Sequence, residues 1–294
     1  MTNTFLTIVA NQNFKYDESV NFLKNHFYLD IANSTVLSTN AISFEIRDFD
    51  DSKKTHMKKV FTQKKIDFCF LDKFKIPSKI FLCDMDSTII KNETLDDLVK
   101  MCGAEARVID ETSRLAMEGK IDIKSTLSSR VSLLKGKPKS MIEDVIKGIK
   151  YNQGSNTLIK TLNNNKFNTY LITGGFKPIS TYVGERLEFQ NIISNEFEFE
   201  NDKTFKGTYV PIAGEKNSKL EFMRKLSAEK DIEFKDFVAL GDGANDLGML
   251  QNSGLGIGYN SHKIIKDNIE TQINFTDLTS VLYFLQIKKE DFIR

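Results

Sequence analysis

Two carboxylates stand directly after a short apolar run in the first third of the chain. The run 80–83 ends at Asp84, and Asp86 follows two positions later. A continuous apolar run of this length is typical of a strand that is buried on both faces. Because ligands bind beyond the carboxyl ends of strands in an open parallel sheet, we expect both carboxylates to lie where chemistry takes place. Taken alone, they would fit an acidic turn equally well.

Two later runs also end in polar groups. The run 168–172 leads into Thr173 and Gly174, and the run 237–240 leads into a Gly-Asp-Gly turn that contains Asp242. The carboxyl ends of parallel strands meet at one edge of a sheet. These groups should therefore join the first two carboxylates at that edge.

Four carboxylates would gather there, since Asp246 and the amide of Asn245 follow Asp242 closely. Left alone, such carboxylates repel one another, and some of them keep their protons. A hard divalent cation relieves this repulsion, and Mg²⁺ prefers one or two carboxylates, several waters and a phosphate oxygen. The acidic cluster therefore predicts Mg²⁺ as the cofactor and a phosphate ester as the substrate.

Neighbouring groups suit a phosphate ester. The hydroxyl of Thr173 and the backbone N–H of Gly174 are able to bind phosphate oxygens. Lys219, at a predicted helix start, would add a positive charge, and Lys216 is the alternative for that lysine. One carboxylate would attack phosphorus to form an aspartyl-phosphate, and a neighbouring carboxylic acid would protonate the leaving oxygen.

The composition is that of a globular protein without an electrostatic preference for nucleic acid. The 294 residues include 41 basic and 40 acidic side chains, a net charge of +1, with no basic footprint for a nucleic-acid partner. No apolar run approaches the ~20 residues that span a bilayer, and residues 1–13 lack the features of a signal peptide. Three cysteines, an odd number, argue against a disulfide framework. We expect a cytoplasmic protein.

Residues 1–76 are predicted to form a small α+β unit. Their strand and helix patterns follow the order β-α-β-β-α-β, which is typical of a ferredoxin-like unit. The predicted segments are 4–10, 17–27, 34–38, 41–47, 52–64 and 66–71. The polar stretch 72–79, which contains Pro77, is the predicted linker.

Residues 77–294 are predicted to form the larger unit. After the strand 80–83, helical patterns alone occupy an insert at about 93–152, the kind of element that forms a lid. Its helices are expected at 94–101, 105–119, 123–134 and 139–150. Further helices are expected at 154–165, 178–187, 219–228, 246–251, 264–266 and 278–285, and further strands at 168–172, 197–200, 204–209, 237–240, 255–258 and 272–275. This alternation predicts an α/β fold, a doubly wound parallel sheet with helices on both faces.

The motifs together resemble a known family. Residues 84–88 (DMDST) resemble the DxDx[TV] signature of the haloacid dehalogenase-like hydrolases, and Thr173 resembles their second motif. Lys219 and the stretch 241–246 (GDGAND) resemble the third and fourth motifs. Longer stretches are similar to the phosphoserine phosphatases of that superfamily, namely 85–98, 116–136, 172–176 and 239–250. The resemblance covers about residues 79–285, and four motifs in the right order make it specific.

The resemblance implies a role for each acidic residue. Asp84 would be the nucleophile that becomes phosphorylated. Asp86 would be the general acid and base, and would also give its backbone carbonyl to Mg²⁺. Asp84 and Asp242 would be the direct carboxylate ligands of the metal. Asp246 and Asn245 would support the metal and its waters.

The remaining implied roles concern the substrate. The phosphate would be held by Thr173, Gly174 and Lys219, with Asn245 nearby. In the helical insert, Glu93 would meet an ammonium group and Arg130 a carboxylate, which a planar guanidinium grips at two points, while Met117 would line that side. A first-turn helix position for Glu93, a solvated Arg130 and ordinary core packing of Met117 are the alternatives. In relatives, Ser usually stands at the position of Thr173, and an aromatic residue is frequent at that of Ile123.

The implied activity is Mg²⁺-dependent hydrolysis of O-phospho-L-serine to L-serine and phosphate, the last step of serine synthesis. The alternatives are another small phosphomonoesterase, a phosphotransferase of the same fold, and a non-catalytic amino-acid-binding regulator. The substrate would be a small molecule, with neither nucleic acid nor membrane as a partner. In the order of its elements, the unit 1–76 resembles the ACT-like domain of some members. A homodimer through this unit and a packing role for it are equally open.

Overall fold

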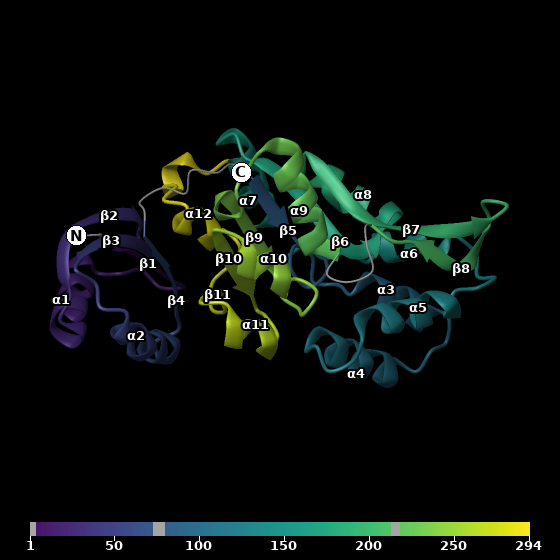
Figure 1. Cartoon of the computed structure of the whole chain (residues 1–294), viewed down its shortest axis with the longest axis horizontal. Helices are drawn as coiled ribbons and strands as arrows, with labels where there is room; N and C mark the ends of the chain where they lie inside the picture. Colours follow the sequence, from purple (N-terminus) through teal and green to yellow (C-terminus); the bar gives the residue numbers. More distant parts are fainter. Residues whose placement is uncertain (1–3, 73–79, 213–217) are drawn as a thin grey trace.

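The computed structural model describes residues 4–72, 80–212 and 218–294 as an elongated molecule, with the N-terminal unit at one end and a group of helices with a β-hairpin at the other (Figure 1). The elements of the N-terminal unit are β1 (Thr4–Ala10), α1 (Tyr16–Phe27), β2 (Asp30–Ser38), β3 (Ala41–Arg47), α2 (Ser52–Gln63) and β4 (Ile66–Leu71). The predicted order β-α-β-β-α-β is confirmed. The predicted linker lies mostly outside the described residues.

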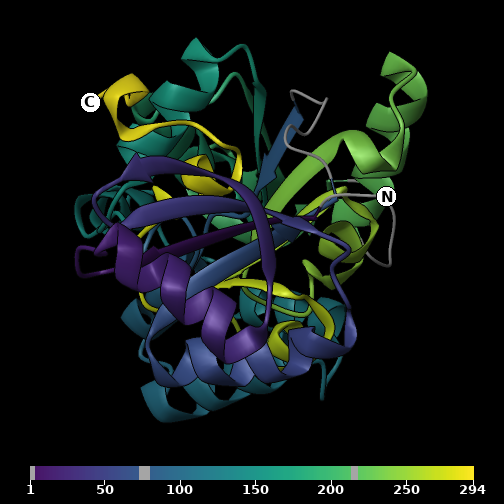
Figure 2. The same ribbon diagram turned by 90° about the vertical axis from the view of Figure 1, so that its left-hand side faces the viewer.

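The N-terminal unit is an antiparallel sheet with its two helices on one face. The strands follow the order β2-β3-β1-β4, and α1 and α2 lie together beneath them (Figure 2). The buried side chains of Leu23 on α1 and Phe61 on α2 pack with Leu6 and Phe44 of the central strands. Strand β2 begins at Asp30, four residues before the predicted start. The prediction missed these residues because Ile31 and Ala32, between Asp30 and Asn33, are too short an apolar run to indicate a strand.

The larger unit begins with β5 (Ile80–Cys83) and continues into a helical insert. The insert comprises α3 (Thr94–Met101), α4 (Ala106–Met117), α5 (Ile123–Leu133) and α6 (Met141–Lys147). The elements that follow are α7 (Ser155–Asn164), β6 (Asn168–Phe176), α8 (Lys177–Arg186), β7 (Asn191–Glu200), β8 (Thr204–Val210), α9 (Ser218–Lys230), β9 (Phe237–Gly241), α10 (Leu247–Asn252), β10 (Leu255–Tyr259), α11 (Lys263–Asn268), β11 (Thr271–Ile273) and α12 (Ser280–Phe284), with short 3₁₀ turns at Phe234–Asp236 and Lys289–Asp291.

The sheet of the larger unit is covered by helices on both faces, as predicted. Its strands follow the order β11-β10-β9-β5-β6-β7-β8, and all neighbours pair in parallel except the hairpin of β7 and β8. On β5, Ile80 and Leu82 face the cluster that contains α9, α10 and α11. Phe81 and Cys83 face the cluster that contains α7, α8 and α12. The period of two places successive side chains on opposite faces, so a strand buried on both reads as a continuous apolar run.

The two units share one sheet, which the sequence did not indicate. Strand β4 pairs with β11 in antiparallel orientation at Phe68 and Gln272, so eleven strands of the described residues are continuous. One hydrophobic cluster also crosses the boundary, from Cys69 on β4 to Phe284 on α12. The N-terminal unit is therefore packed against the larger unit through backbone and side chains.

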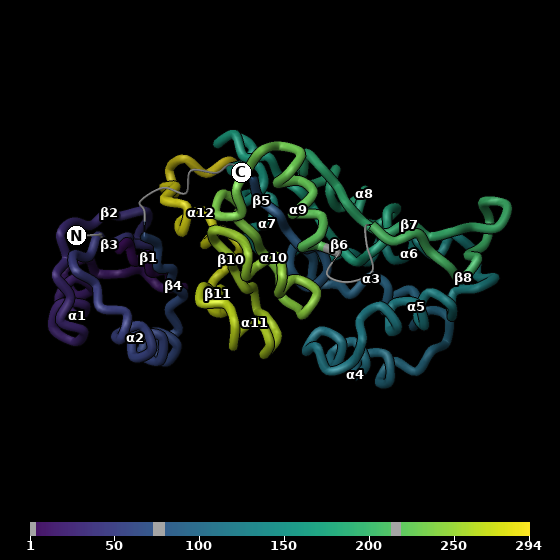
Figure 3. The backbone as a smooth tube through the Cα atoms, in the orientation of Figure 1, coloured from purple at the N-terminus to yellow at the C-terminus, as the bar shows by residue number. Residues whose placement is uncertain are grey.

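The helical insert leaves and rejoins the sheet through two adjacent segments, which can be followed in the backbone tube (Figure 3). The backbone N–H of Asn152 donates to the carbonyl of Ile89 at 2.9 Å, and that of Lys91 donates to the carbonyl of Lys150 at 2.7 Å. The side-chain amide of Asn152 also donates to the carbonyl of Thr88 at 2.8 Å. These bonds pair 88–92 with 149–152 at the base of the insert, and we call these two segments the hinge.

The hairpin of β7 and β8 differs from its prediction. Strand β7 begins at Asn191, not at 197, and its first half pairs with β6 before its second half turns to pair with β8. The segment 191–196 contains only two apolar residues, so no strand pattern was visible. None of the described helices has both the length and the apolar character needed to cross a membrane.

Candidate active site

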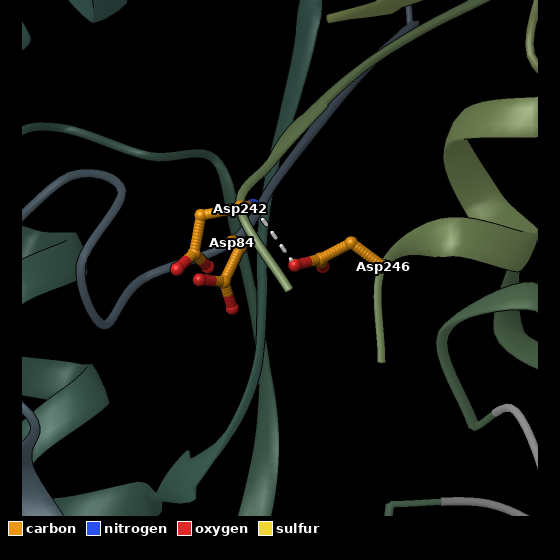
Figure 4. Close-up of side chains that lie close together, drawn as sticks. All are labelled: Asp84, Asp242 and Asp246. Carbon is orange, nitrogen blue, oxygen red and sulfur yellow. Dashed lines mark hydrogen bonds between the residues drawn. The ribbon is translucent and has the colours of Figure 1, made fainter. Parts of the chain in front are cut away.

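Three carboxylates from three elements meet at the carboxyl ends of β5 and β9. Asp84 follows β5, Asp242 follows β9, and Asp246 precedes α10. One oxygen from each lies within 4.8 Å of the others, and all three residues are buried. The carboxylates of Asp84 and Asp242 lie side by side, while that of Asp246 approaches the backbone of Asp242 (Figure 4). Because the backbone N–H of Asp84 donates to the carbonyl of Leu240 at 3.0 Å, strand pairing fixes this geometry.

Lys219 at the start of α9 is buried behind this cluster. Its ammonium group donates to a carboxylate oxygen of Asp84 and, at 2.6 Å, to Oδ1 of Asp246. The other oxygen of Asp246 accepts the backbone N–H groups of Asp242 at 3.1 Å and Gly243 at 3.2 Å. Both oxygens of Asp246 are thus engaged within the protein. Burial disfavours the charged form of Lys219, but the carboxylates of Asp246 and Asp84 outweigh this and raise its pKa.

The donor set fits a hard divalent cation. Burial, followed by the negative charges of Asp84 and Asp246, raises the pKa of Asp242 well above its usual range. Burial also raises the pKa of Asp84 to about 6, although Lys219 opposes the shift. Carboxylates that repel one another in a buried site are stabilised by a cation with oxygen ligands. Asp84 and Asp242 have the oxygens available for such an ion, whereas Asp246 has none to spare.

Asp86 is held just beyond Asp84, at the base of the helical insert. Its Oδ1 accepts the backbone N–H of Thr94 at 3.0 Å. Burial, followed by the negative charges of Glu93 and Asp84, raises the pKa of Asp86 well above its usual range. A carboxyl group whose pKa is raised holds its proton to higher pH, which suits a general acid.

The end of β6 forms an open backbone corner beside these carboxylates. The hydroxyl of Thr173 accepts the backbone N–H of Gly175 at 2.9 Å. A Cβ on Gly174 would meet nothing within 4 Å, so its backbone faces open space. A Cβ on Gly175 would lie 2.9 Å from Oδ2 of Asp86, so only glycine lets the two come this close. The side-chain amide of Asn195 donates to the carbonyl of Gly174 at 2.7 Å and steadies the corner.

The helical insert closes over the carboxylates and leaves a cavity of about 90 Å³. The cavity is lined at its base by Asp84, Asp86, Thr173, Gly174, Gly175, Asp242 and Asn245, and on the side of the insert by Glu93, Leu95, Asp96, Ser113, Ala116, Met117, Ile123, Thr126, Leu127 and Arg130. The carbonyl of Met117 accepts the backbone N–H of Ala244 at 2.9 Å, which joins the insert to the base. A volume this small suits a small-molecule ligand.

Two charged groups of opposite sign face the cavity from the insert. Glu93 is half-buried and accepts the hydroxyl of Ser87 at 2.6 Å rather than capping α3. Burial raises the pKa of Glu93 to about 7, with smaller contributions from Asp96 and Asp84, although the Ser87 hydrogen bond opposes the shift. Arg130 is buried, with its Nε 3.0 Å from Oδ1 of Asp96. The alternative of a solvated surface arginine is therefore wrong.

The structure brings the predicted site residues together, but they do not all reach the cavity. Nine of them line the cavity, whereas Lys219 and Asp246 lie beneath it. Oδ1 of Asn245 is buried and has no hydrogen-bond partner among the described residues, as expected of a group that awaits a ligand. Lys216, the alternative lysine, lies outside the described residues.

Sequence reasoning missed Asp96, Gly175 and Asn195. Asp96 lies three residues after Glu93, which is the N-cap residue of α3, so both side chains stand at the start of that helix. That spacing was the available signal for Asp96. Nothing in the local sequence marks Asn195, since it reaches the corner from the unpredicted first half of β7.

Comparisons with known proteins agree with this geometry. The family model of the haloacid dehalogenase-like hydrolases matches residues 81–251. The phosphoserine phosphatase of Methanocaldococcus jannaschii is 32% identical over 208 residues, which is 71% of this chain and 98% of that protein.

Solved structures also resemble the chain. A substrate-bound phosphoserine phosphatase complex has a TM-score of 0.66 at 32% identity, covering 71% of this chain and 98% of the other. A haloacid dehalogenase family hydrolase from Salmonella enterica serovar Typhi has a TM-score of 0.83 at 24% identity, covering 99% of this chain and 100% of the other, which shows a shared fold. On the family model, the relatives and the buried carboxylate site, the chain belongs to the haloacid dehalogenase-like hydrolase family, and within it to the phosphoserine phosphatases.

Proposed function

We propose that the chain hydrolyses O-phospho-L-serine to L-serine and phosphate, the last step of serine synthesis. One observation carries the proposal: a single small cavity has Asp84 and Asp86 at one end and the opposite charges of Glu93 and Arg130 at the other. A phosphate ester fits the first end. A group that carries both an ammonium and a carboxylate fits the second.

Hydrolases of this family generally use a divalent metal ion, and we infer that it is Mg²⁺ here. Side-chain oxygens of Asp84 and Asp242, with the backbone carbonyl of Asp86, would hold it. Asp246 would support these ligands through its bonds to Lys219 and to the backbone of Asp242. When bound, the ion would neutralise negative charge on the carboxylates and on the phosphate.

The residues of the chain divide the chemistry between them. The free oxygen of Asp84 attacks phosphorus, so that an acyl-phosphate O–P bond forms and the ester O–P bond breaks. Asp86 gives its proton to the departing serine oxygen. Asp86 then takes a proton from the water that attacks the aspartyl-phosphate, which releases phosphate and restores Asp84.

The phosphate oxygens would be held by the backbone N–H of Gly174, the hydroxyl of Thr173, the amide of Asn245 and the ammonium of Lys219. Three of these four groups line the cavity. Lys219 contacts Asp84 directly, so its charge is close to the oxygens that Asp84 attacks. At the other end, Glu93 would bind the substrate ammonium and Arg130 its carboxylate.

The test is a phosphate-release assay with Mg²⁺ on phosphoserine, phosphothreonine, phosphoethanolamine and a sugar phosphate. We expect kcat/KM to be highest for phosphoserine and to fall for phosphoethanolamine, which lacks the carboxylate. Removal of metal with a chelator should abolish turnover, and Mg²⁺ should restore it. A higher kcat/KM for a sugar phosphate, or transfer of phosphate to an added alcohol in preference to water, would contradict the proposal.

A homodimer through the N-terminal unit remains a prediction. Among the described residues, β2 is the outer strand of the shared sheet, and its edge is available for pairing with a second copy. Light scattering of the intact chain, compared with a chain lacking residues 1–76, would test it.

A further inference from the structure

A second carboxylate of the helical insert lines the cavity beside Glu93. Asp96, in the first turn of α3, is only 4% exposed. Its Oδ1 lies 3.0 Å from Nε of Arg130, and its Oδ2 accepts the hydroxyl of Ser113 on α4. A buried carboxylate with two partners inside a ligand cavity is placed too specifically to be a solvated face of the helix.

The guanidinium of Arg130 is also held at its NH2 group. Its NH2 group donates to the carbonyl of Ile109 at 2.8 Å and to the hydroxyl of Thr112 at 2.7 Å. Arg130 comes from α5, Asp96 from α3, and the other two from α4, so three helices fix one planar group. Its NH1 group has no hydrogen-bond or ion-pair partner in the part of the chain that the structure describes.

This arrangement has a consequence for carboxylate recognition. A guanidinium binds a carboxylate best when its N–H groups meet the oxygens in one plane. A free arginine side chain loses considerable rotamer freedom when it adopts one orientation. The carboxylate of Asp96 pairs with Nε by charge, while Nε makes no hydrogen bond among the described residues. This ion pair and the two hydrogen bonds of NH2 hold the plane before any ligand arrives, and NH1 stays available.

We propose that Asp96 is a positioning residue, which holds Arg130 in the orientation that receives the carboxylate of an α-amino-acid phosphate ester. The inference rests on the proposed function and adds a residue that determines its specificity. Asp96 acts through Arg130 and has no contact with the reacting atoms. The rival explanation is that Asp96 only ties the helices of the insert together.

The experiment compares phosphoserine with phosphoethanolamine, which has the same phosphate and ammonium but no carboxylate. Asp96→Ala should raise KM for phosphoserine by roughly 10- to 100-fold, because the buried guanidinium loses the carboxylate that pairs with it. Its kcat should change little, and KM for phosphoethanolamine should stay near the wild-type value. Asp96→Asn should recover only part of the loss, because its amide keeps the shape of the side chain and a partner for Ser113 but not the charge that pairs with the guanidinium.

The matched control is Asp110→Asn. Asp110 on α4 forms an ion pair with Lys100 on α3 at 2.5 Å, so it also joins two helices of the insert, but it does not line the cavity. This variant should leave both KM values unchanged. If it shifts them as Asp96→Ala does, a general loosening of the insert explains the effect, and the proposal is overturned.

A double-mutant cycle gives a readout that a structural role would not produce. In an Arg130→Ala background, Asp96→Ala should cause no further rise in KM, since there is no guanidinium left to position. A further rise of similar size in that background, or equal rises for both substrates, would overturn the proposal. A wild-type enzyme that does not prefer phosphoserine would instead contradict the proposed function, so the two failures are distinguishable.

Discussion

Lys219 governs how the buried carboxylates share their tasks. It contacts Asp84 and Asp246 but not Asp86 or Asp242. One oxygen of Asp84 is therefore fixed by a positive charge, and its other oxygen is free to attack. Asp86, whose nearest charged neighbours are carboxylates, keeps its proton more readily. Because Lys219 contacts Asp84 but not Asp86, these two carboxyl groups, only two positions apart, serve as nucleophile and acid respectively.

Because Asp84 supplies the attacking oxygen, we expect Asp84→Asn to remove turnover. An amide is a poor nucleophile, so kcat should fall by roughly 10³-fold or more, as expected when a nucleophile is lost. The amide oxygen is still able to accept from Lys219, so circular dichroism should show a folded variant. The measurement is phosphate release together with trapping of a covalent phosphoprotein. A variant that retains either would exclude Asp84 as the nucleophile.

Glu93 should make the stability of the metal-free protein depend on pH. Its pKa is about 7 in the fold and 4.5 as the reference value. Because the folded state binds this proton more strongly, Glu93 favours folding below about pH 4.5, and its contribution is lost as the pH rises to about 7. Glu93→Gln should therefore stabilise the protein by about 1–3 kcal/mol at about pH 8 and by almost nothing at about pH 4.5.

Urea unfolding in the presence of a chelator at both pH values measures this difference. The glutamine is able to accept the Ser87 hydroxyl as Glu93 does, so the comparison isolates the charge. An equal effect at both pH values would show that the charge of Glu93 is not the cause.

Among the elements, the corner at the end of β6 shows how packing restricts which residue a position accepts. Gly174 and Gly175 are neighbours with opposite surroundings. A Cβ on Gly174 has open space, whereas one on Gly175 would approach both Oδ2 of Asp86 and the Cε of Met85 at 2.9 Å. Substitution of each glycine by alanine therefore compares a methyl group in open space with one in a crowded position.

We expect Gly175→Ala to destabilise the protein by about 1–3 kcal/mol through overpacking, and to lower kcat by moving Asp86. Gly174→Ala should leave stability nearly unchanged but raise KM, because its methyl group would enter the phosphate region. Thermal unfolding and steady-state kinetics on both variants measure the contrast. Equal losses of stability would mean that the contact with Asp86 is not limiting.

The sequence predicted those elements whose own apolar side chains follow the period of a strand or a helix. Strands β1, β3 and β4 and helix α3 lie where their patterns placed them. The first half of β7 was missed because its burial comes from pairing with β6 and not from apolar side chains. The pair of Asp96 and Arg130 was missed for a similar reason, since the partners are 34 positions apart and meet only when three helices pack.

For the whole molecule, Asp67 on β4 is the main polar tie between the two units. It is 2% exposed and accepts the backbone N–H groups of Asn274, Phe275 and Thr276 and the hydroxyl of Thr276. The same loop continues to Leu278, whose backbone N–H donates to the carbonyl of Gln153 at 3.1 Å, next to the hinge of the insert. The N-terminal unit thus contacts the loop that supports the hinge.

Asp67→Ala should lower the free energy of unfolding by about 3–5 kcal/mol, because three partly buried backbone donors and a hydroxyl lose their buried acceptor. Asp50→Ala, which removes an exposed carboxylate that accepts from Ser52 in the same unit, should lower the free energy of unfolding far less, because water replaces the lost contacts. Hydrogen exchange should then accelerate at 274–278 and at 149–154 in the Asp67 variant alone. If exchange rises at 274–276 while 149–154 stays protected, the N-terminal unit supports the loop without influencing the hinge. If the two variants cost the same, Asp67 is not the main polar tie between the units.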